Sequence, residues 1–340
     1  MSTAGDVRFA GAAPPGRSCP ADYLYPQGAL AAASDGEADV LYVAGGLYGN
    51  TEALEVLRAR AATESGHVRV IFGGDFHWFD AAADEFSAIA QGVAAFEAIA
   101  GNVERELTRD EPRAGCGCGY PPYVSEGIVE RSNAIIARLR QTAITAPGHC
   151  EWMKSLPTFL AIRVAGERIL VLHGDTRSLA GWAFATEAMP DAPEALRDRL
   201  AVNAIHATRA EWIAQEFRRV DARVIACSHT CLPFARRVCS STVDGLLINN
   251  GAAGMPNFHA SPCGLVTRIA AGPAIPAGSL YGTQIGAVRC DAVALEYDSA
   301  VWWDRFRRQW PVGSPADVSY ADRLLRGPDY CLEWVFVGPQ

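Results

Sequence analysis

The stretch from Val68 to Asp80, VRVIFGGDFHWFD, establishes the class of fold. It begins with Val68–Phe72, an apolar run rich in β-branched and aromatic residues, which is typical of a buried strand. Two glycines and Asp75 follow at once, so a carboxylate comes directly after the carboxyl end of this strand. Open α/β sheets bind their ligands at that edge. The stretch therefore predicts an α/β protein with a ligand site where its strands end.

The same alternation of strand, polar loop and helix recurs along the chain. A helix that begins at Thr51, as its N-cap, is expected to carry Leu54 and Leu57. A second helix is expected to place one apolar face inward, made of Phe86, Ile89, Val93, Phe96 and Ile99. Further strands are predicted at residues 40–44, 159–164, 168–172, 224–227, 245–248 and 288–297.

Composition excludes several classes of protein. The chain has 340 residues, 49% of them hydrophobic, which is enough for a substantial core. Its formal net charge of −8 argues against general nucleic-acid binding. No apolar stretch has the length of a signal peptide or a membrane span, so a cytoplasmic protein without membrane contact is expected. The ten cysteines are then expected to be reduced thiols.

The organisation along the chain is expected to be a single main domain with additions. Residues 1–37 are interpreted as an N-terminal extension and residues 38–298 as the main domain. An irregular stretch and a helix near 105–145 are interpreted as an insertion. Residues 299–340, rich in Trp and Arg, are expected to form a tail packed on the domain.

Five short motifs occur in a characteristic order. They are Gly74-Asp75, Gly101-Asn102, the lone His173, Ser228-His229-Thr230-Cys231 and Asn249-Asn250-Gly251. In this order they resemble the calcineurin-like metallophosphoesterases over roughly residues 38–298. The resemblance implies a double β-sandwich flanked by helices, a four-layer αββα arrangement, that holds two metal ions.

The resemblance implies one complete set of metal ligands: Asp75, Asn102, His173 and His229. A carboxylate, an amide oxygen and two imidazoles suit Mn²⁺, Fe²⁺ or Zn²⁺. The other metal position has lost its expected Asp and His, which are replaced by Gly46 and Tyr48, and one further His, replaced by Cys231. One ion is therefore expected, and a second could be held by Tyr48 and Cys231, with His77, around Asp75.

The expected proton donor of the third motif is also missing, because Val103 stands where the resemblance implies a histidine. His77 and Glu104 are the candidate catalytic residues that could replace it. Each also has a structural interpretation, His77 as a packing residue and Glu104 as a carboxylate that orients a ligand. Cys116 and Cys118 could act at the pocket as metal or redox groups, or could simply be buried turn residues.

Two main functions remain open on the sequence. The first is a metal-dependent hydrolase of a small phosphomonoester or phosphodiester. The second is a catalytically inactive relative that binds a phosphorylated ligand or partner. A third hypothesis gives Tyr48 and Cys231 an iron or zinc site with oxidative or thiol chemistry. The sequence predicts no particular oligomeric state.

Overall fold

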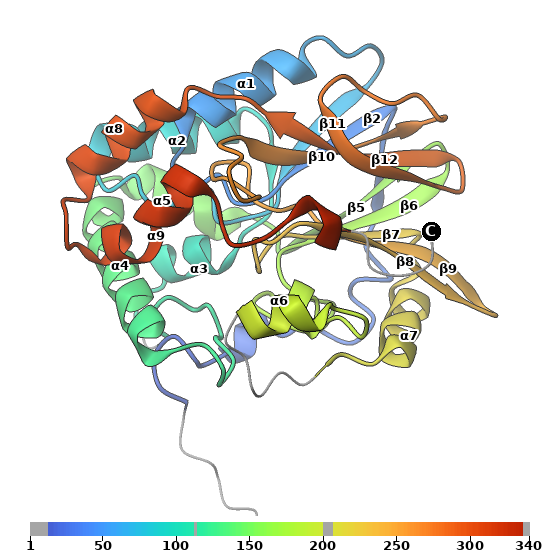
Figure 1. Ribbon diagram of the computed structural model, residues 1–340, viewed down its shortest axis with the longest axis horizontal. Coiled ribbons are helices and arrows are strands. Elements are labelled where there is room, and N and C mark those ends of the chain that lie inside the picture. The colour runs from blue at the N-terminus through green and yellow to red at the C-terminus, as the bar shows by residue number, and fades with distance from the viewer. Residues whose placement is uncertain (1–12, 112–113, 200–206, 336–340) are drawn as a thin grey trace, which may run out of the picture.

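The computed structural model describes residues 13–335 except 112–113 and 200–206, and it contains two six-stranded mixed sheets (Figure 1). One sheet has the strand order β11-β12-β10-β2-β3-β4. Strands β2, β3 and β4 are parallel, and β10 joins them in the antiparallel sense. Its strands are β2 (Val40–Ala44), β3 (Val68–Phe72), β4 (Glu97–Ala98), β10 (Gly264–Ala271), β11 (Ser279–Ile285) and β12 (Val288–Leu295).

The other sheet has the strand order β1-β5-β6-β7-β9-β8. Strands β6, β7 and β9 are parallel, so the loops that follow them leave from the same edge. Its strands are β1 (Asp35–Ala38), β5 (Phe159–Val164), β6 (Glu167–Leu172), β7 (Val224–Cys227), β8 (Phe234–Ser240) and β9 (Val243–Asn249).

Strand β2 shows how the two sheets and the helices are layered. Alternate side chains point to opposite faces of a strand. Leu41 and Val43 join the apolar cluster between the sheets, which also contains residues of β5, β6 and β7. Val40, Tyr42 and Ala44 join a second cluster together with helical residues. Both faces of this strand are therefore buried, as the expected four-layer arrangement requires.

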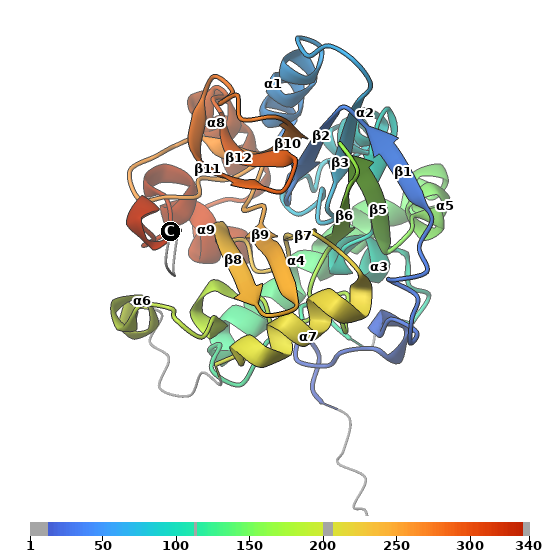
Figure 2. The same cartoon turned by 90° about the vertical axis from the view of Figure 1, so that its right-hand side faces the viewer.

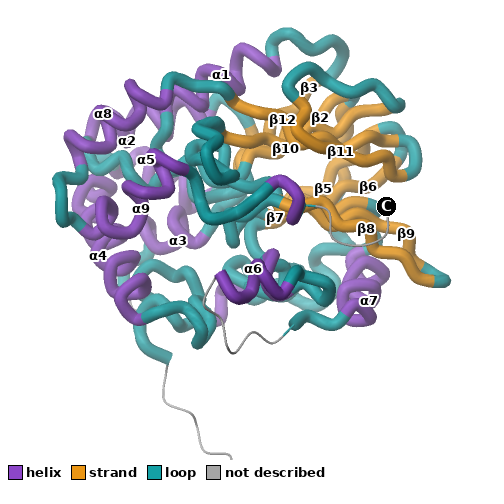
Figure 3. Tube along the Cα trace, viewed as in Figure 1, coloured by secondary structure: helices purple, strands orange, loops and turns teal. Residues whose placement is uncertain are grey.

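Helices cover the outer faces of the sheets and close one end of the molecule (Figures 2 and 3). In Figure 2, α7 lies across the outer side of the sheet that contains β8 and β9, and it packs against both strands. Most other helices gather at the opposite end from the strands in Figure 3. The helices are α1 (Thr51–Ala61), α2 (Ala83–Ala94), α3 (Asn102–Thr108), α4 (Glu126–Ile144), α5 (Pro147–Ser155), α6 (Glu194–Arg199), α7 (Ala210–Val220), α8 (Ser299–Gln309) and α9 (Pro315–Arg326), with single 3₁₀ turns at Ala21–Tyr23, Thr186–Ala188 and Leu332–Trp334.

Two helix boundaries differ from those predicted. Asn50, rather than Thr51, is the N-cap of α1, because its side-chain oxygen accepts a hydrogen bond from the Ala53 N–H. Helix α2 ends at Ala94, so Phe96 and Ile99 lie outside it, on either side of the short strand β4. The apparent helical period continues past the true end because the apolar residues that flank the short strand β4 extend it by coincidence.

Segments near both ends of the described chain contribute to the main body of the fold. Strand β1 pairs with β5 and crosses the boundary that was expected after residue 37. Helices α8 and α9 pack through Trp302, Phe306 and Leu324 into the same apolar cluster as α1 and α2. None of the helices in the described part of the chain is both long enough and apolar enough to span a bilayer.

Candidate metal centre

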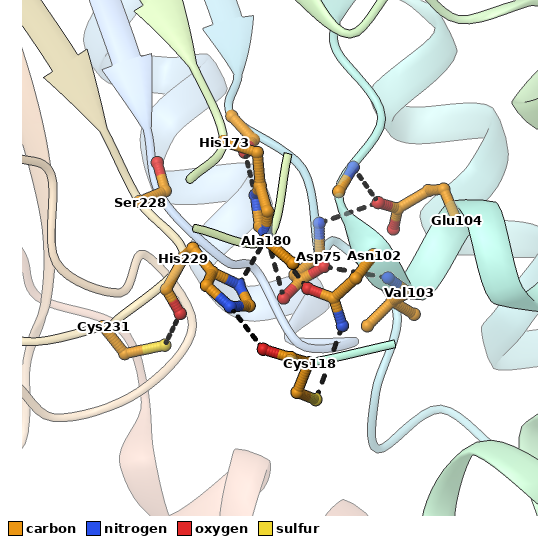
Figure 4. Close-up of polar contacts among 12 residues, drawn as sticks. Asp75, Asn102, Val103, Glu104, Cys118, His173, Ala180, Ser228, His229 and Cys231 are labelled. Atoms are coloured by element: carbon orange, nitrogen blue, oxygen red, sulfur yellow. Dashed lines mark hydrogen bonds and ion pairs between the residues drawn. The ribbon is translucent and has the colours of Figure 1, made fainter. Parts of the chain in front are cut away.

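Four side chains converge where the loops after three strands meet the start of α3 (Figure 4). Asp75 follows β3, His173 follows β6, and His229 comes two residues after β7. Asn102 is the first residue of α3. The structure thus brings together all four residues that the resemblance implied as one ligand set.

The distances among these side chains centre on His173. Its Nε2 atom lies 3.1 Å from Asn102 Oδ1 and 3.1 Å from His229 Nδ1. The same Nε2 lies 3.4 Å from Asp75 Oδ2. The candidate ligand atoms of the carboxylate and the two imidazoles all lie within 4.8 Å of one another. These atoms are therefore close enough to one another to be candidate ligands of a single ion.

Backbone carbonyls orient three of the four ligands. His173 Nδ1–H donates to the Gly73 carbonyl at 2.7 Å, and His229 Nε2–H donates to the Cys118 carbonyl at 2.9 Å. Asn102 Nδ2 donates to the Cys116 carbonyl at 2.9 Å. Each ligand therefore spends its donor outward and presents a lone pair inward, as metal-binding histidines held by an outer acceptor do.

The electrostatics of the group favour a positive charge at its centre. Burial alone opposes a charged imidazole, but the adjacent Asp75 carboxylate nevertheless raises the pKa of His173. Burial also opposes the charged carboxylate of Asp75, whose pKa is nevertheless lowered by His173. Burial and the neighbouring His173 lower the pKa of His229 to about 4. Nitrogen and oxygen atoms that converge on one point beside a carboxylate thus suit a positively charged occupant such as a divalent cation.

Glu104 holds the loops that carry the ligands. Its Oε2 accepts hydrogen bonds from the Asp75 and Gly101 N–H groups, both at 2.8 Å. Its Oε1 accepts from the Phe76 N–H at 3.1 Å. The side chain is fully buried, and burial together with Asp75 raises its pKa. The geometry supports the orienting interpretation of Glu104, and a catalytic role stays a prediction.

His77 is not brought into the group. Its Nδ1 lies 2.5 Å from Asp80 Oδ2, and its ring stacks on Phe86 with centroids 3.9 Å apart. It is fully buried and is not among the residues that line the cavity at the metal centre. Its contacts are those of a packing residue, so its role as a proton donor stays a prediction without geometric support.

A cavity of about 140 Å³ opens beside the candidate ligands. Three of the four ligands, all but the more deeply placed His173, line it. Its full lining is Tyr48, Asp75, Trp78, Asn102, Val103, Cys118, Tyr120, Trp182, His229, Thr230, Cys231, Met255, Tyr320 and Arg323.

Tyr48 and Cys231 meet in this cavity, with the Tyr48 hydroxyl 2.6 Å from Cys231 Sγ. Burial raises the pKa of both groups, so the phenol and the thiol are neutral near pH 7. A Cβ added at Gly46 would lie 2.1 Å from the Tyr48 ring. The ring therefore fills the space that a side chain at position 46 would need, and the second metal site stays a prediction.

Sequence reasoning missed the residues that reach the cavity from outside the motifs. Tyr120 and Trp182 form part of its wall, and their ring centroids are 5.7 Å apart. Tyr320 and Arg323 come from α9, in the stretch that was expected only to pack on the domain. Their spacing resembles that of any amphipathic helix, so no local signal could have marked them.

Comparison with known proteins supports the fold independently of the motifs. No family model matches the sequence, and no curated protein matches it either. Among solved structures, a metallophosphoesterase from Sphaerobacter thermophilus is 15% identical, with a TM-score of 0.50 over 85% of this chain and 100% of its own. A hypothetical protein from Pyrococcus horikoshii OT3 is 14% identical, with a TM-score of 0.55 over 86% of this chain and 99% of its own.

These likenesses and the two-sheet architecture define the class: the chain has the calcineurin-like metallophosphoesterase fold. The expectation of that fold from the five motifs is therefore confirmed. Within this fold, Asp75, His173 and His229 lie together with Asn102 as a buried group that could hold a metal ion. Fold by itself does not assign an activity, which has to be argued from the site.

Proposed function

We propose that the protein is a metal-dependent phosphoesterase that acts on a small phosphorylated substrate through a single ion. The observation that carries this proposal is the convergence of Asp75 with Asn102, His173 and His229, the last three of which each direct a donor outward to a backbone carbonyl. Such a group is costly to bury unless a cation completes it. The donor set suits Mn²⁺, Fe²⁺ or Zn²⁺.

The chain's own residues would then have distinct parts in the reaction. When bound, a divalent ion supplies Lewis acidity towards a phosphoryl oxygen and lowers the pKa of water. Asp75, Asn102, His173 and His229 hold it, and Glu104 keeps the Asp75 and Gly101 loops in register. The cavity is small, so it admits the phosphoryl group and leaves most of a larger leaving group outside.

A second function is favoured by one feature of the same cavity. Val103 lines it at the position where the resemblance implies a histidine, and His77 does not line it. A site without that proton donor suits either a substrate with a good leaving group or a phosphorylated ligand that is bound without turnover. The second candidate function is therefore recognition of a phosphorylated ligand.

The test combines metal analysis with turnover. Protein purified without chelators is expected to contain one ion per chain by elemental analysis, and to hydrolyse p-nitrophenyl phosphate. His173→Ala is expected to lose both, while His259→Ala, a control at an exposed histidine, is expected to keep both. Metal with phosphate binding but without turnover would favour the second function. Absence of metal after loading with each candidate ion would refute the proposal.

A further inference from the structure

Arg323 brings a positive charge to the cavity from the far end of the sequence. It lies on α9, and its guanidinium is held by two backbone carbonyls of other loops. Nε donates to the Pro256 carbonyl at 3.3 Å, and Nη2 donates to the Cys231 carbonyl at 3.2 Å. A guanidinium has five N–H donors, so these two contacts position it and leave others to face the cavity.

The partners of Arg323 differ from those of neighbouring arginines. Arg305, Arg307 and Arg326 on α8 and α9 each form an ion pair with a carboxylate. In the described part of the chain, Arg323 has no carboxylate within ion-pairing distance, and its two hydrogen bonds go to neutral carbonyls. Its charge is thus positioned but not neutralised, which is typical of an arginine that binds an anionic ligand.

The remaining groups of the cavity do not compensate this charge. Among the described lining residues, Asp75 is the single carboxylate. A divalent ion held by one carboxylate and three neutral ligands keeps a net charge of about +1, and the guanidinium of Arg323 adds a second positive charge. The cavity would then match a dianion in charge.

We propose that Arg323 is the second cationic group of the site, and that it binds the phosphoryl oxygens of a dianionic phosphomonoester in place of a second metal ion. The inference rests on the proposed metal centre and narrows its substrate class. The Tyr48 ring occupies the space beside Gly46, and Arg323 donates to the carbonyl of Cys231. The guanidinium of Arg323 therefore lies on the side of the cavity where the expected ligands of a second metal ion are replaced. A phosphodiester carries one negative charge fewer and a second ester group, so Arg323 strengthens its binding less than that of a phosphomonoester.

The test separates metal binding from anion binding. Metal-loaded wild type, Arg323→Met and Arg323→Lys are titrated calorimetrically with inorganic phosphate, and their metal content is measured by elemental analysis. Arg326→Met is the matched control, since Arg326 lies on the same helix but is exposed and paired with Asp322. Arg323→Met is expected to keep its metal and to bind phosphate about 10- to 100-fold more weakly. Arg323→Lys should fall between, because lysine keeps the charge and loses the fork of donors.

Turnover supplies the second readout. The ratio of kcat/KM for p-nitrophenyl phosphate over bis(p-nitrophenyl) phosphate is expected to fall at least tenfold in Arg323→Met. Phosphate affinity unchanged in a folded, metal-loaded Arg323→Met would overturn the inference and leave the metal centre standing. No phosphate binding to the metal-loaded wild type would overturn it too. Metal-dependent phosphate binding that needs Arg323, without hydrolysis, would support the inference while refuting the hydrolase proposal.

Discussion

Replacing Glu104 with glutamine tests whether this buried carboxylate orients the metal ligands or transfers a proton. The amide oxygen can keep the two bonds that Oε2 accepts from the Asp75 and Gly101 N–H groups. The amide nitrogen then faces the Phe76 N–H, because that group donates to Oε1. One acceptor is lost and two donors are forced together, at the base of the loop that carries Asp75.

The magnitude follows from that count of bonds. Losing one hydrogen bond to a charged acceptor costs about 1.5–3 kcal/mol. Because burial raises the pKa of Glu104, removing its charge returns part of this cost. The net loss in free energy of unfolding is therefore expected to be about 1–2 kcal/mol for the metal-free protein. The displaced loop should also weaken metal binding by roughly 10- to 100-fold.

The assays are urea unfolding of chelated protein and a metal titration, with Glu106→Gln as the control. Glu106 is a buried carboxylate on the same helix, but its bonds go to Tyr23 and Arg109 rather than to the ligand loops. The control is expected to leave metal affinity unchanged. If Glu104→Gln kept both stability and metal affinity but abolished turnover, Glu104 would be a proton donor and the orienting role would be refuted.

Three further outcomes are expected. Gly101→Ala should weaken metal binding at least tenfold, because its Cβ would lie 2.3 Å from Asp75 Oδ1. Gly148→Ala, with open space at its Cβ, should leave metal affinity unchanged. Equal metal affinities of the two variants in a metal titration would contradict this reasoning. Chelation should lower the free energy of unfolding by about 2.7 kcal/mol when the free ion had stood at 100 times its Kd, and an unchanged thermal midpoint would contradict the site. The hydrogen bonds of Arg268 lower the pKa of Glu64 in the folded protein. This carboxylate therefore stabilises the fold fully at a pH above its pKa in the unfolded chain, and the stabilisation is lost as the pH falls through the lower pKa of the folded state. Glu64→Gln should thus cost roughly 1 kcal/mol at pH 7 and almost nothing in acid, and a loss that persists in acid unfolding curves would argue against this ion pair.

Local patterns in the sequence predicted the centre of the fold well. The runs at 40–44 and 68–72 became β2 and β3, and the residues after the strands supplied Asp75, His173 and His229. The strand predictions succeeded because a buried strand and the glycine turn that ends it are specified within a few neighbouring positions, whereas metal binding by these residues stays a prediction.

Predictions failed where the outcome depended on partners distant along the chain. The short strand β4 forms because Glu97–Ala98 can pair with β3, which no helical or alternating pattern reveals. For His77, two residues after the candidate ligand Asp75, the structure shows contacts with Asp80 and Phe86 in the core, so its role as a proton donor stays a prediction. Sequence proximity to a functional residue does not specify the direction of a side chain.

The sequence by itself determined the types of ligand and the order in which their loops occur, because strand, turn and ligand signals are local. Only the tertiary structure decided how those ligands face one another. The carbonyls of Cys116 and Cys118 select which atoms of Asn102 and His229 point inward. Packing of α9 likewise brings Arg323 to a loop 92 residues earlier in the chain. Such contacts depend on how whole elements pack against one another, and no short stretch of sequence encodes that packing.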